Sequence, residues 1–214
     1  MKAAIFSWHG CKLEVKGSCV EYTAEETPMV SYVNTHFALE KLRDEAQKKG
    51  GEGPRILVIG PSNSGKTTLV KLLTAYAVRM GRQPMVINTD SREGILSIPG
   101  SLTATPFASI LDVEEGWGSS PSSGPSPVPV KLPLCYYYGL ANPEDNTRLY
   151  KPTLTRLAIT ATSRLVDDPI VKSTGMIIDT PGSIAQSGKD NFDLISHIVK
   201  EFQGSYIKAL SMNG

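Results

Sequence analysis

The residues best suited to chemistry in this 214-residue chain form one short run, Gly60-Pro61-Ser62-Asn63-Ser64-Gly65-Lys66-Thr67. The run fits the phosphate-binding pattern G-x-x-x-x-G-K-[ST], in which successive backbone N–H groups surround the phosphates of a nucleotide. Its lysine reaches the terminal phosphates, and its threonine hydroxyl coordinates magnesium. We therefore expect a nucleoside triphosphate to contact Gly60, Asn63, Ser64, Gly65, Lys66, Thr67 and Thr68.

The elements that must position this loop are recognisable on both sides of it. Residues 55–59 (Arg-Ile-Leu-Val-Ile) are typical of a short buried strand, and residues 66–80 have the apolar spacing of a helix. A strand, a glycine-rich turn and a helix aim several N–H groups and the positive end of the helix dipole at one point. A chance match in a Gly/Ser-rich loop is the alternative, and the two flanking elements argue against it.

A magnesium site next to such a loop also needs a carboxylate from a neighbouring strand. Asp90 follows the strand expected over residues 84–88, and Asp179 ends the strand expected over residues 174–179. Both aspartates would lie at the carboxyl edge of a parallel sheet, where such folds bind ligands. We expect Thr67 and Asp90 to hold the metal and keep Asp179 as the second candidate, since aspartates also serve in turns and helix caps.

The order of elements predicts the fold class and the division of the chain. Strands and helices alternate from residue 54, including helices over 146–165 and 190–202, which predicts an α/β fold: a P-loop NTPase parallel sheet with helices on both faces. Residues 1–30 read as a few strands, too few for a domain, and 31–53 as a helix and linker. The domain itself would span 54–214, with a disordered Ser/Pro-rich insertion at 117–133.

Composition excludes several classes of protein. A net charge of +1 provides no general attraction for nucleic acid, so contact with RNA would be local or would come through partners. Three cysteines are too few for a disulfide framework, and no apolar run is long enough to span a membrane. Three arginines lie roughly on one side of the expected helix: Arg148, Arg156 and Arg164. The ordinary interpretation is a basic face exposed to solvent, and the alternative is a surface that contacts phosphate groups.

Several further motifs occur together in one order, and in combination they are specific. They are Phe6-Ser7-Trp8-His9-Gly10-Cys11, Thr27-Pro28-Met29, Asn34-Thr35-His36-Phe37-Ala38-Leu39-Glu40, the phosphate loop, Tyr76-Ala77-Val78-Arg79, Ser97-Ile98-Pro99-Gly100 and Asp112-Val113-Glu114-Glu115-Gly116. With them nearly the whole chain resembles fungal Clp subunits of the pre-mRNA cleavage and polyadenylation machinery, within the polynucleotide 5′-hydroxyl kinase family.

The resemblance implies three domains: an N-terminal β-sandwich, a central P-loop ATPase-like domain and a C-terminal β-rich domain. By this comparison the chain is cut at both ends, and residues 1–30 are a remnant of the β-sandwich. Lys2 matches a family lysine that contacts the nucleotide. The resemblance also implies ATP and Mg²⁺ as ligands, a nuclear location, and partners among the cleavage-factor subunits, notably the termination factor that binds the polymerase tail.

The chain differs from the family's RNA kinases at the residues that bind and position the RNA substrate. Their Asp-x-Gly-Gln is Asp90-Ser91-Arg92-Glu93 here, and their substrate clasp reads Ala141-Asn142-Pro143-Glu144-Asp145-Asn146. The tryptophan that stacks on the RNA base is replaced by Ser183, and the arginine-bearing lid lies beyond the region that the chain matches. Phosphoryl transfer depends on positioning and charge neutralisation, so these changes predict nucleotide binding without turnover.

Three functions remain open at this point. The first is an ATP-binding scaffold subunit of the complex, required for endonucleolytic cleavage and for the assembly of its partners. The second is an active ATP-dependent RNA 5′-hydroxyl kinase that uses Lys66, Thr67 and Asp90. The third is a GTPase-like switch built on Asp179-Thr180-Pro181-Gly182, although the chain has no guanine-specifying Asn-Lys-x-Asp.

Overall fold

The structure is a computed structural model, and it describes residues 12, 14–18, 28–109, 132–185 and 189–210. Lys2, nearly all of the strand-like segment before residue 28, and nearly all of the expected insertion at 117–133 lie outside these residues. In chain order the elements are α1 (Met29–Lys49), β1 (Arg55–Ile59), α2 (Lys66–Arg79), β2 (Met85–Asn88), β3 (Ser101–Pro106), β4 (Leu134–Tyr137), η1 (Pro143–Asn146), α3 (Thr147–Asp167), α4 (Pro169–Thr174), β5 (Met176–Asp179), η2 (Ser183–Ala185), α5 (Lys189–Phe202) and β6 (Tyr206–Ala209).

The six strands form one sheet in the order β4-β3-β2-β5-β1-β6. β2, β5, β1 and β6 pair in parallel, as the alternation of strands and helices predicts. β3 and β4 extend the sheet beyond β2 through antiparallel pairs, so the sheet is mixed but mostly parallel. β5 lies between β1 and β2, and this order brings Asp179 next to the phosphate loop.

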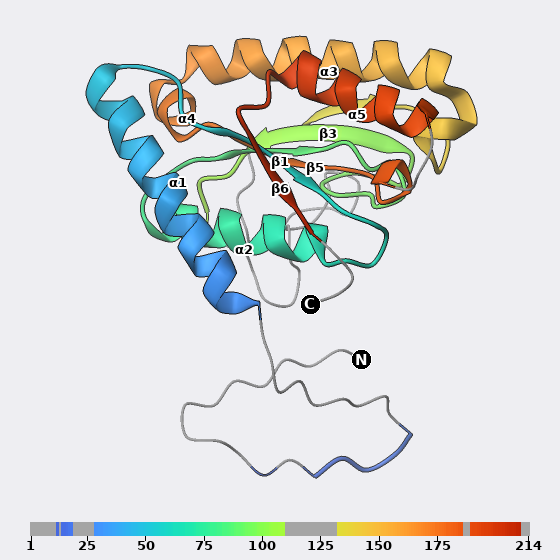
Figure 1. The fold of residues 1–214 in the computed structure, drawn as a ribbon, viewed down its shortest axis with the longest axis horizontal. Coiled ribbons are helices and arrows are strands. Elements are labelled where there is room, and N and C mark those ends of the chain that lie inside the picture. The colour runs from blue at the N-terminus through green and yellow to red at the C-terminus, as the bar shows by residue number, and fades with distance from the viewer. Residues whose placement is uncertain (1–11, 13, 19–27, 110–131, 186–188, 211–214) are drawn as a thin grey trace.

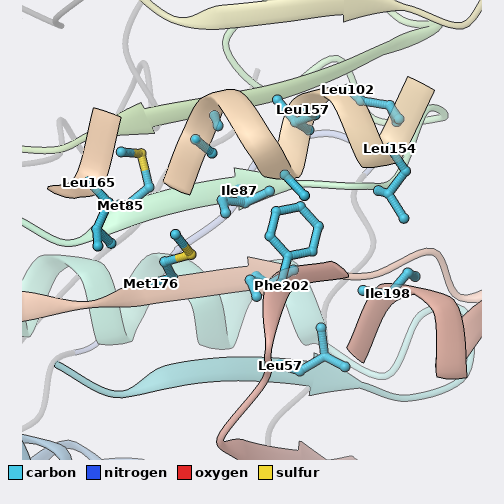
Figure 2. Packing of buried hydrophobic residues seen from close by; sticks show 14 of the residues in the cluster. Leu57, Met85, Ile87, Leu102, Leu154, Leu157, Leu165, Met176, Ile198 and Phe202 are labelled. Carbon is cyan, nitrogen blue, oxygen red and sulfur yellow. The ribbon is translucent and has the colours of Figure 1, made fainter. Parts of the chain in front are cut away.

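Helices cover both faces of the sheet, as expected. Figure 1 shows α3 and α5 on one face and α1 and α2 on the other. On the first face, Leu154, Leu157 and Phe202 pack with strand residues such as Ile87, and Figure 2 shows this core. On the second face, Leu69 and Leu73 of α2 pack with Ile56 and Val58 of β1. The phosphate loop follows β1 directly and therefore lies at the carboxyl edge of the parallel strands.

Two elements differ from expectation. α1 begins at Met29, two residues before the segment 31–53 that was expected to be helix and linker, and its buried residues Tyr32 and Leu39 belong to the same core as α2. The segment before β5 contains a separate short helix, α4, so the strand expected from Thr174 begins at Met176. Asp168 begins this helix by accepting hydrogen bonds from the backbone N–H groups of Ile170 and Val171.

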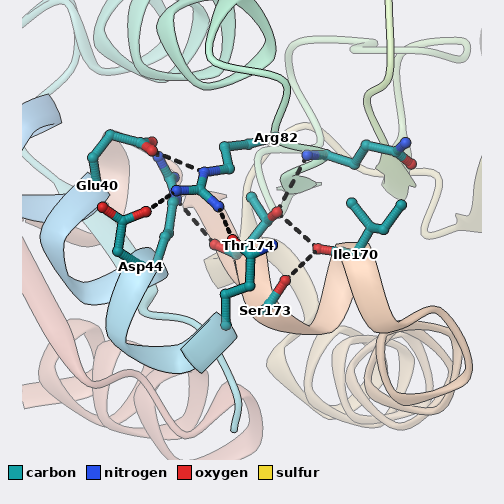
Figure 3. Close-up of polar contacts among 9 residues, drawn as sticks. Glu40, Asp44, Arg82, Ile170, Ser173 and Thr174 are labelled. Atoms are coloured by element: carbon teal, nitrogen blue, oxygen red, sulfur yellow. Dashed lines mark hydrogen bonds and ion pairs between the residues drawn. The ribbon is translucent and has the colours of Figure 1, made fainter. Parts of the chain in front are cut away.

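A buried polar network fastens α1 to the rest of the fold. Arg43, 1% exposed, donates from Nη1 to Glu40 Oε1 at 2.6 Å and from Nε to the Thr174 carbonyl at 3.1 Å. The other oxygen of Glu40 accepts from Arg82 Nε at 2.9 Å, and Arg82 also pairs with Asp44. Figure 3 shows these side chains between α1 and α4. The network therefore joins α1 to the residues after α2 and to the end of α4, and its central pair, Arg43 and Glu40, is almost inaccessible to water.

Candidate nucleotide-binding site

The phosphate loop connects the end of β1 to the start of α2, as predicted. Gly65 precedes the helix with φ +83°, a left-handed conformation that glycine adopts without strain. The loop is closed by two hydrogen bonds to the Pro61 carbonyl, from Ser64 Oγ and from Lys66 Nζ, both at 2.8 Å. Lys66 is thus held over the loop and is only 7% exposed, so its charge is concentrated at one place.

A cavity of about 570 Å³ lies in front of this loop. It is lined by Ser62, Asn63, Gly65, Lys66, Thr67, Thr68, Asp90, Arg92, Glu93 and Gly182. The fold brings to this cavity six residues that the sequence analysis had named as contacts of the nucleotide or the metal: Asn63, Gly65, Lys66, Thr67, Thr68 and Asp90. Gly60 and Ser64 are instead part of the loop's internal structure: a Cβ on Gly60 would lie 2.6 Å from Ser64 Oγ. Lys2 lies outside the described residues.

The two candidate carboxylates have different environments. Asp179 accepts a 2.7 Å hydrogen bond from Thr67 Oγ1, while its other oxygen, Oδ1, is buried and has no hydrogen-bond partner among the residues that the structure describes. Asp90 lines the cavity, and its Oδ1 accepts from the backbone N–H of Arg92 at 3.0 Å. Burial raises the pKa of both carboxyls, and nearby Glu93 raises both further; the pKa of Asp179 reaches about 7. Together with the Thr67 hydroxyl, these two carboxyls supply the kind of oxygen ligands that a divalent cation binds.

The raised pKa of Asp179 predicts a pH-dependent stability. Its pKa moves from 3.8 to about 7 on folding, so the folded state binds this proton more tightly than the unfolded state does. The protonated carboxyl therefore stabilises the folded state fully below pH 3.8, and this stabilisation is lost as the pH rises through 7. Between pH 5 and 8 the free energy of unfolding should fall by up to about 3 kcal/mol. We expect Asp179→Asn to remove most of this slope in denaturant unfolding without Mg²⁺ or nucleotide. Asp193→Asn, at an exposed position, is the control, and equal slopes for Asp179→Asn and the wild-type chain would contradict the prediction.

The cavity also contains residues that the sequence had not marked as nucleotide contacts. Gly182 approaches the phosphate loop so closely that a Cβ there would lie 2.6 Å from Ser62 Cα. Arg92 and Glu93, which stand where the family's RNA kinases have Gly-Gln, are exposed at the cavity. Gly182 belongs to the Asp179–Gly182 motif that was considered for a nucleotide switch, but its contact with Ser62 depends on the strand order.

The segment resembling the substrate clasp is tied down within the protein. Asp145 Oδ2 accepts from the backbone N–H of Asn142 at 3.1 Å and forms a capping box at the start of η1. Glu144 Oε2 accepts from Ser183 Oγ at 3.1 Å, so the clasp contacts the loop after β5. Both acidic side chains therefore have structural partners within the protein.

Tyr150 of α3 holds the backbone next to Asp90 in place. Its ring is fully buried, and its hydroxyl donates a 2.8 Å hydrogen bond to the carbonyl of Thr89, the residue before Asp90. We expect Tyr150→Phe to lower the free energy of unfolding by about 1 kcal/mol, because the buried carbonyl loses its donor. Thermal unfolding would then shift by roughly 2–4 °C. Tyr137→Phe, at an exposed ring, should leave the transition unchanged; an equal loss in both variants would contradict this role.

The described part of the chain contains neither a cluster of metal-binding side chains nor a helix suited to crossing a membrane. No three His, Cys, Asp or Glu side chains there gather closely enough to hold a metal ion by themselves. A divalent cation at Thr67 would therefore need phosphate oxygens or water to complete its coordination. Among the same residues, no helix combines the length and the apolar character that a membrane span requires.

Comparison with known proteins gives a consistent result. A family profile described as "mRNA cleavage and polyadenylation factor CLP1 P-loop" matches residues 60–213, and one described as "N-terminal beta-sandwich domain of polyadenylation factor" matches residues 1–46. The chain is 71% identical to mRNA cleavage and polyadenylation factor clp1 of Botryotinia fuckeliana over 209 residues, which is 98% of this chain and 45% of that protein. It is 57% identical to the Aspergillus niger protein of the same name, over 94% of this chain and 41% of that protein.

Solved structures of Clp1p also match this chain. A complex of wild-type Clp1p with residues 454–563 of Pcf11p matches with a TM-score of 0.76 and 34% identity, over 87% of this chain and 43% of that one. A second Clp1p structure, described by its extended interface with Pcf11p and by ATP loss in a point mutant, matches with a TM-score of 0.75 and 33% identity, over 85% of this chain and 42% of that one. The chain thus spans less than half the length of these relatives. On these matches, it belongs to the CLP1 family of mRNA cleavage and polyadenylation factors.

Proposed function

We propose that this protein is an ATP-binding scaffold subunit of the pre-mRNA 3′-end cleavage and polyadenylation complex and that it does not transfer phosphate. The observation that carries the proposal is the cavity itself. Lys66 and Thr67 are held in place for a triphosphate, while Arg92 and Glu93 line the same cavity. A site of this kind suits a nucleotide that stays bound. The nucleus is the compartment in which such a subunit would act.

ATP would act here as a structural ligand. A ligand that binds only the folded form stabilises it by mass action, with about 2.7 kcal/mol gained at 100 times its dissociation constant. Hydrolysis is unnecessary for this effect. The description of ATP loss in a Clp1p mutant supports adenine nucleotide as the ligand, with contacts from Lys2, Asn63, Gly65, Lys66, Thr67 and Thr68.

Magnesium would bind at the Thr67 hydroxyl and a carboxylate. Asp90 lines the cavity and is the carboxylate that we propose as the metal ligand, directly or through water. Asp179 contacts Thr67 at 2.7 Å, so it would orient the hydroxyl or replace Asp90 as the ligand. Both arrangements leave most of the coordination to phosphate oxygens and water.

The bound nucleotide would fix the surface that the protein presents to its partners. The solved Clp1p–Pcf11p complexes support a Pcf11-type termination factor as one partner. RNA would contact the protein weakly or through other subunits, because the chain carries a net charge of only +1. In this function the protein supports endonucleolytic cleavage by holding other subunits together.

The decisive experiment follows the γ-phosphate of ATP. The purified protein is incubated with γ-labelled ATP, Mg²⁺ and a 5′-hydroxyl RNA, with an active polynucleotide kinase as the positive control. The scaffold proposal predicts that ATP is retained by the protein and that the RNA stays unlabelled. Label on the RNA above the level of the Lys66→Ala variant would overturn it.

An active kinase is the second candidate, and one observation favours it. Asp90 lies in the cavity with Lys66, and burial raises the pKa of its carboxyl, which is the environment of a general base. The same labelling experiment separates this function from the scaffold. A GTPase-like switch is the third candidate, and it predicts that GTP competes with ATP as well as unlabelled ATP does.

A further inference from the structure

The outer side of α3 carries exposed residues at a regular spacing. Intervals of three and four residues alternate along Leu149, Pro152, Arg156, Ile159, Ser163 and Val166, all of which are exposed. This is the spacing of the contact seam between paired helices. We call these six residues the α3 seam. At 1.5 Å per residue it is about 26 Å long, or roughly five helical turns.

The seam faces away from the protein's own core. Its aliphatic members are exposed by 45% at Leu149, 64% at Ile159 and 48% at Val166. The residues on the opposite side of the helix, including Tyr150 and Leu154, are fully buried against the sheet. In Figure 1, α5 lies beside α3, and none of the described elements covers its outer side. Ile159 and Val166 are seven residues apart, which is an interval at which apolar anchors repeat when one helix binds another.

The charge of α3 indicates what kind of helix would bind. α3 contains Arg148, Lys151, Arg156 and Arg164, whereas its only acidic residue is Asp167 at its last position. No ion pair joins Arg148 or Arg156 to an acidic group in the described part of the chain. Arg164 instead donates to the carbonyl of Leu132 at 2.6 Å. The seam therefore carries positive charge at Arg156 and beside it at Arg148, and no acidic group among the described residues pairs with either one.

A hollow lies at one end of the seam. Val166 also lines a cavity of about 500 Å³, together with Pro169, Ile170 and Lys172 of α4. Ile170 is 52% exposed, so the apolar surface continues from the seam into the hollow. The opposite wall is formed by the end of α1 and by Arg82, which Figure 3 shows across from Ile170. A concave end of this size can take an apolar side chain of the bound segment.

We propose that the α3 seam and this hollow form a docking surface for an acidic amphipathic helix of a partner protein. The aliphatic residues would contact its apolar stripe, and Arg148 and Arg156 would pair with its carboxylates. RNA fits less well, because single-stranded RNA is bound by aromatic side chains that stack on its bases, and the seam contains no aromatic residue. A second copy also fits less well, because two positively charged seams would repel one another.

The test uses the full chain and a synthetic 21-residue helix as the probe. The probe has leucine at heptad positions a and d and glutamate at the flanking positions, and binding is measured by fluorescence anisotropy. We expect the double variant Arg148→Glu/Arg156→Glu to bind the probe at least tenfold more weakly than the unmodified chain. Ile159→Asp should produce a similar loss. The matched control, Lys41→Glu/Arg79→Glu, makes the same charge change on α1 and α2 and should bind normally.

The outcomes separate the alternatives. Failure of the probe to bind, or equal binding by the Arg148→Glu/Arg156→Glu variant, would overturn the proposal. Equal binding of a probe with lysine in place of glutamate would also overturn it, and so would preferential binding of oligouridine at the same arginines. All variants should bind Mg·ATP equally, because none of these residues lines the nucleotide cavity. This readout keeps a failure of the docking surface distinct from a failure of the proposed ATP site.

Discussion

Replacing Lys66 with alanine should weaken Mg·ATP binding by about 10- to 100-fold. Lys66 is almost fully buried, lines the cavity and already donates to the Pro61 carbonyl, so its ammonium group is positioned before the nucleotide arrives. A hydrogen bond from a charged donor contributes about 1.5–3 kcal/mol, which corresponds to this loss in affinity. Isothermal titration calorimetry on the two proteins gives the comparison directly.

A thermal measurement separates loss of the ligand from loss of the fold. Saturating Mg·ATP should raise the melting temperature of the unmodified chain by roughly 5–10 °C, because binding adds about 2.7 kcal/mol to a chain of this size. The same ATP concentration should raise that of Lys66→Ala much less. Lys48→Ala removes the same charge from the exposed end of α1 and should respond normally. An equal ATP-induced shift in Lys66→Ala would show that the lysine does not contact the nucleotide.

Replacing Glu40 with leucine should destabilise the protein by about 3 kcal/mol. Glu40 is the counter-charge of Arg43, which is 1% exposed and whose Nη2 finds no hydrogen-bond partner in the described part of the chain. Removing one partner of a buried ion pair leaves the other charge uncompensated, which costs about 3–5 kcal/mol. Arg82 keeps its contact with Asp44, so the loss should come mainly from Arg43. Urea unfolding followed by circular dichroism measures the change.

The same helix provides the control for this prediction. Glu45 is exposed and lies near Lys49 at 3.6 Å, and surface pairs of this kind contribute little. Glu45→Leu should therefore change the free energy of unfolding by less than about 0.5 kcal/mol. If Glu40→Leu were as stable as Glu45→Leu, the network shown in Figure 3 would not be what fastens α1 to the fold.

The phosphate loop could be predicted from sequence because its information is local. The strand, turn and helix are consecutive, and the residue types at Gly65, Lys66 and Thr67 are dictated by that short geometry. The helices α2, α3 and α5 were also predicted, since each repeats apolar residues at helical spacing over several turns. These features depend on neighbours in the chain rather than on the fold as a whole.

Features that depend on distant contacts could not be predicted. β3 carries Ser101, Thr103 and Thr105 in a fully buried strand, and its composition lacks the apolar signal by which buried strands are found. Thr103 is accommodated because its hydroxyl donates to the Ile95 carbonyl at 2.7 Å. Similarly, Asp90 follows the next strand in the chain, but β5 is the strand beside β1, so it is Asp179 that contacts Thr67.

Calorimetric titration of Mg·ATP into the well-folded protein, with the labelled-RNA assay on the same sample, is the most direct test of the central claim. We expect saturable binding at one site, with ATP recovered intact and no phosphate on the RNA. Absence of any heat of binding would contradict the assignment of residues 60–67 as a nucleotide cradle. Binding accompanied by transfer of the γ-phosphate would contradict the scaffold and leave the kinase.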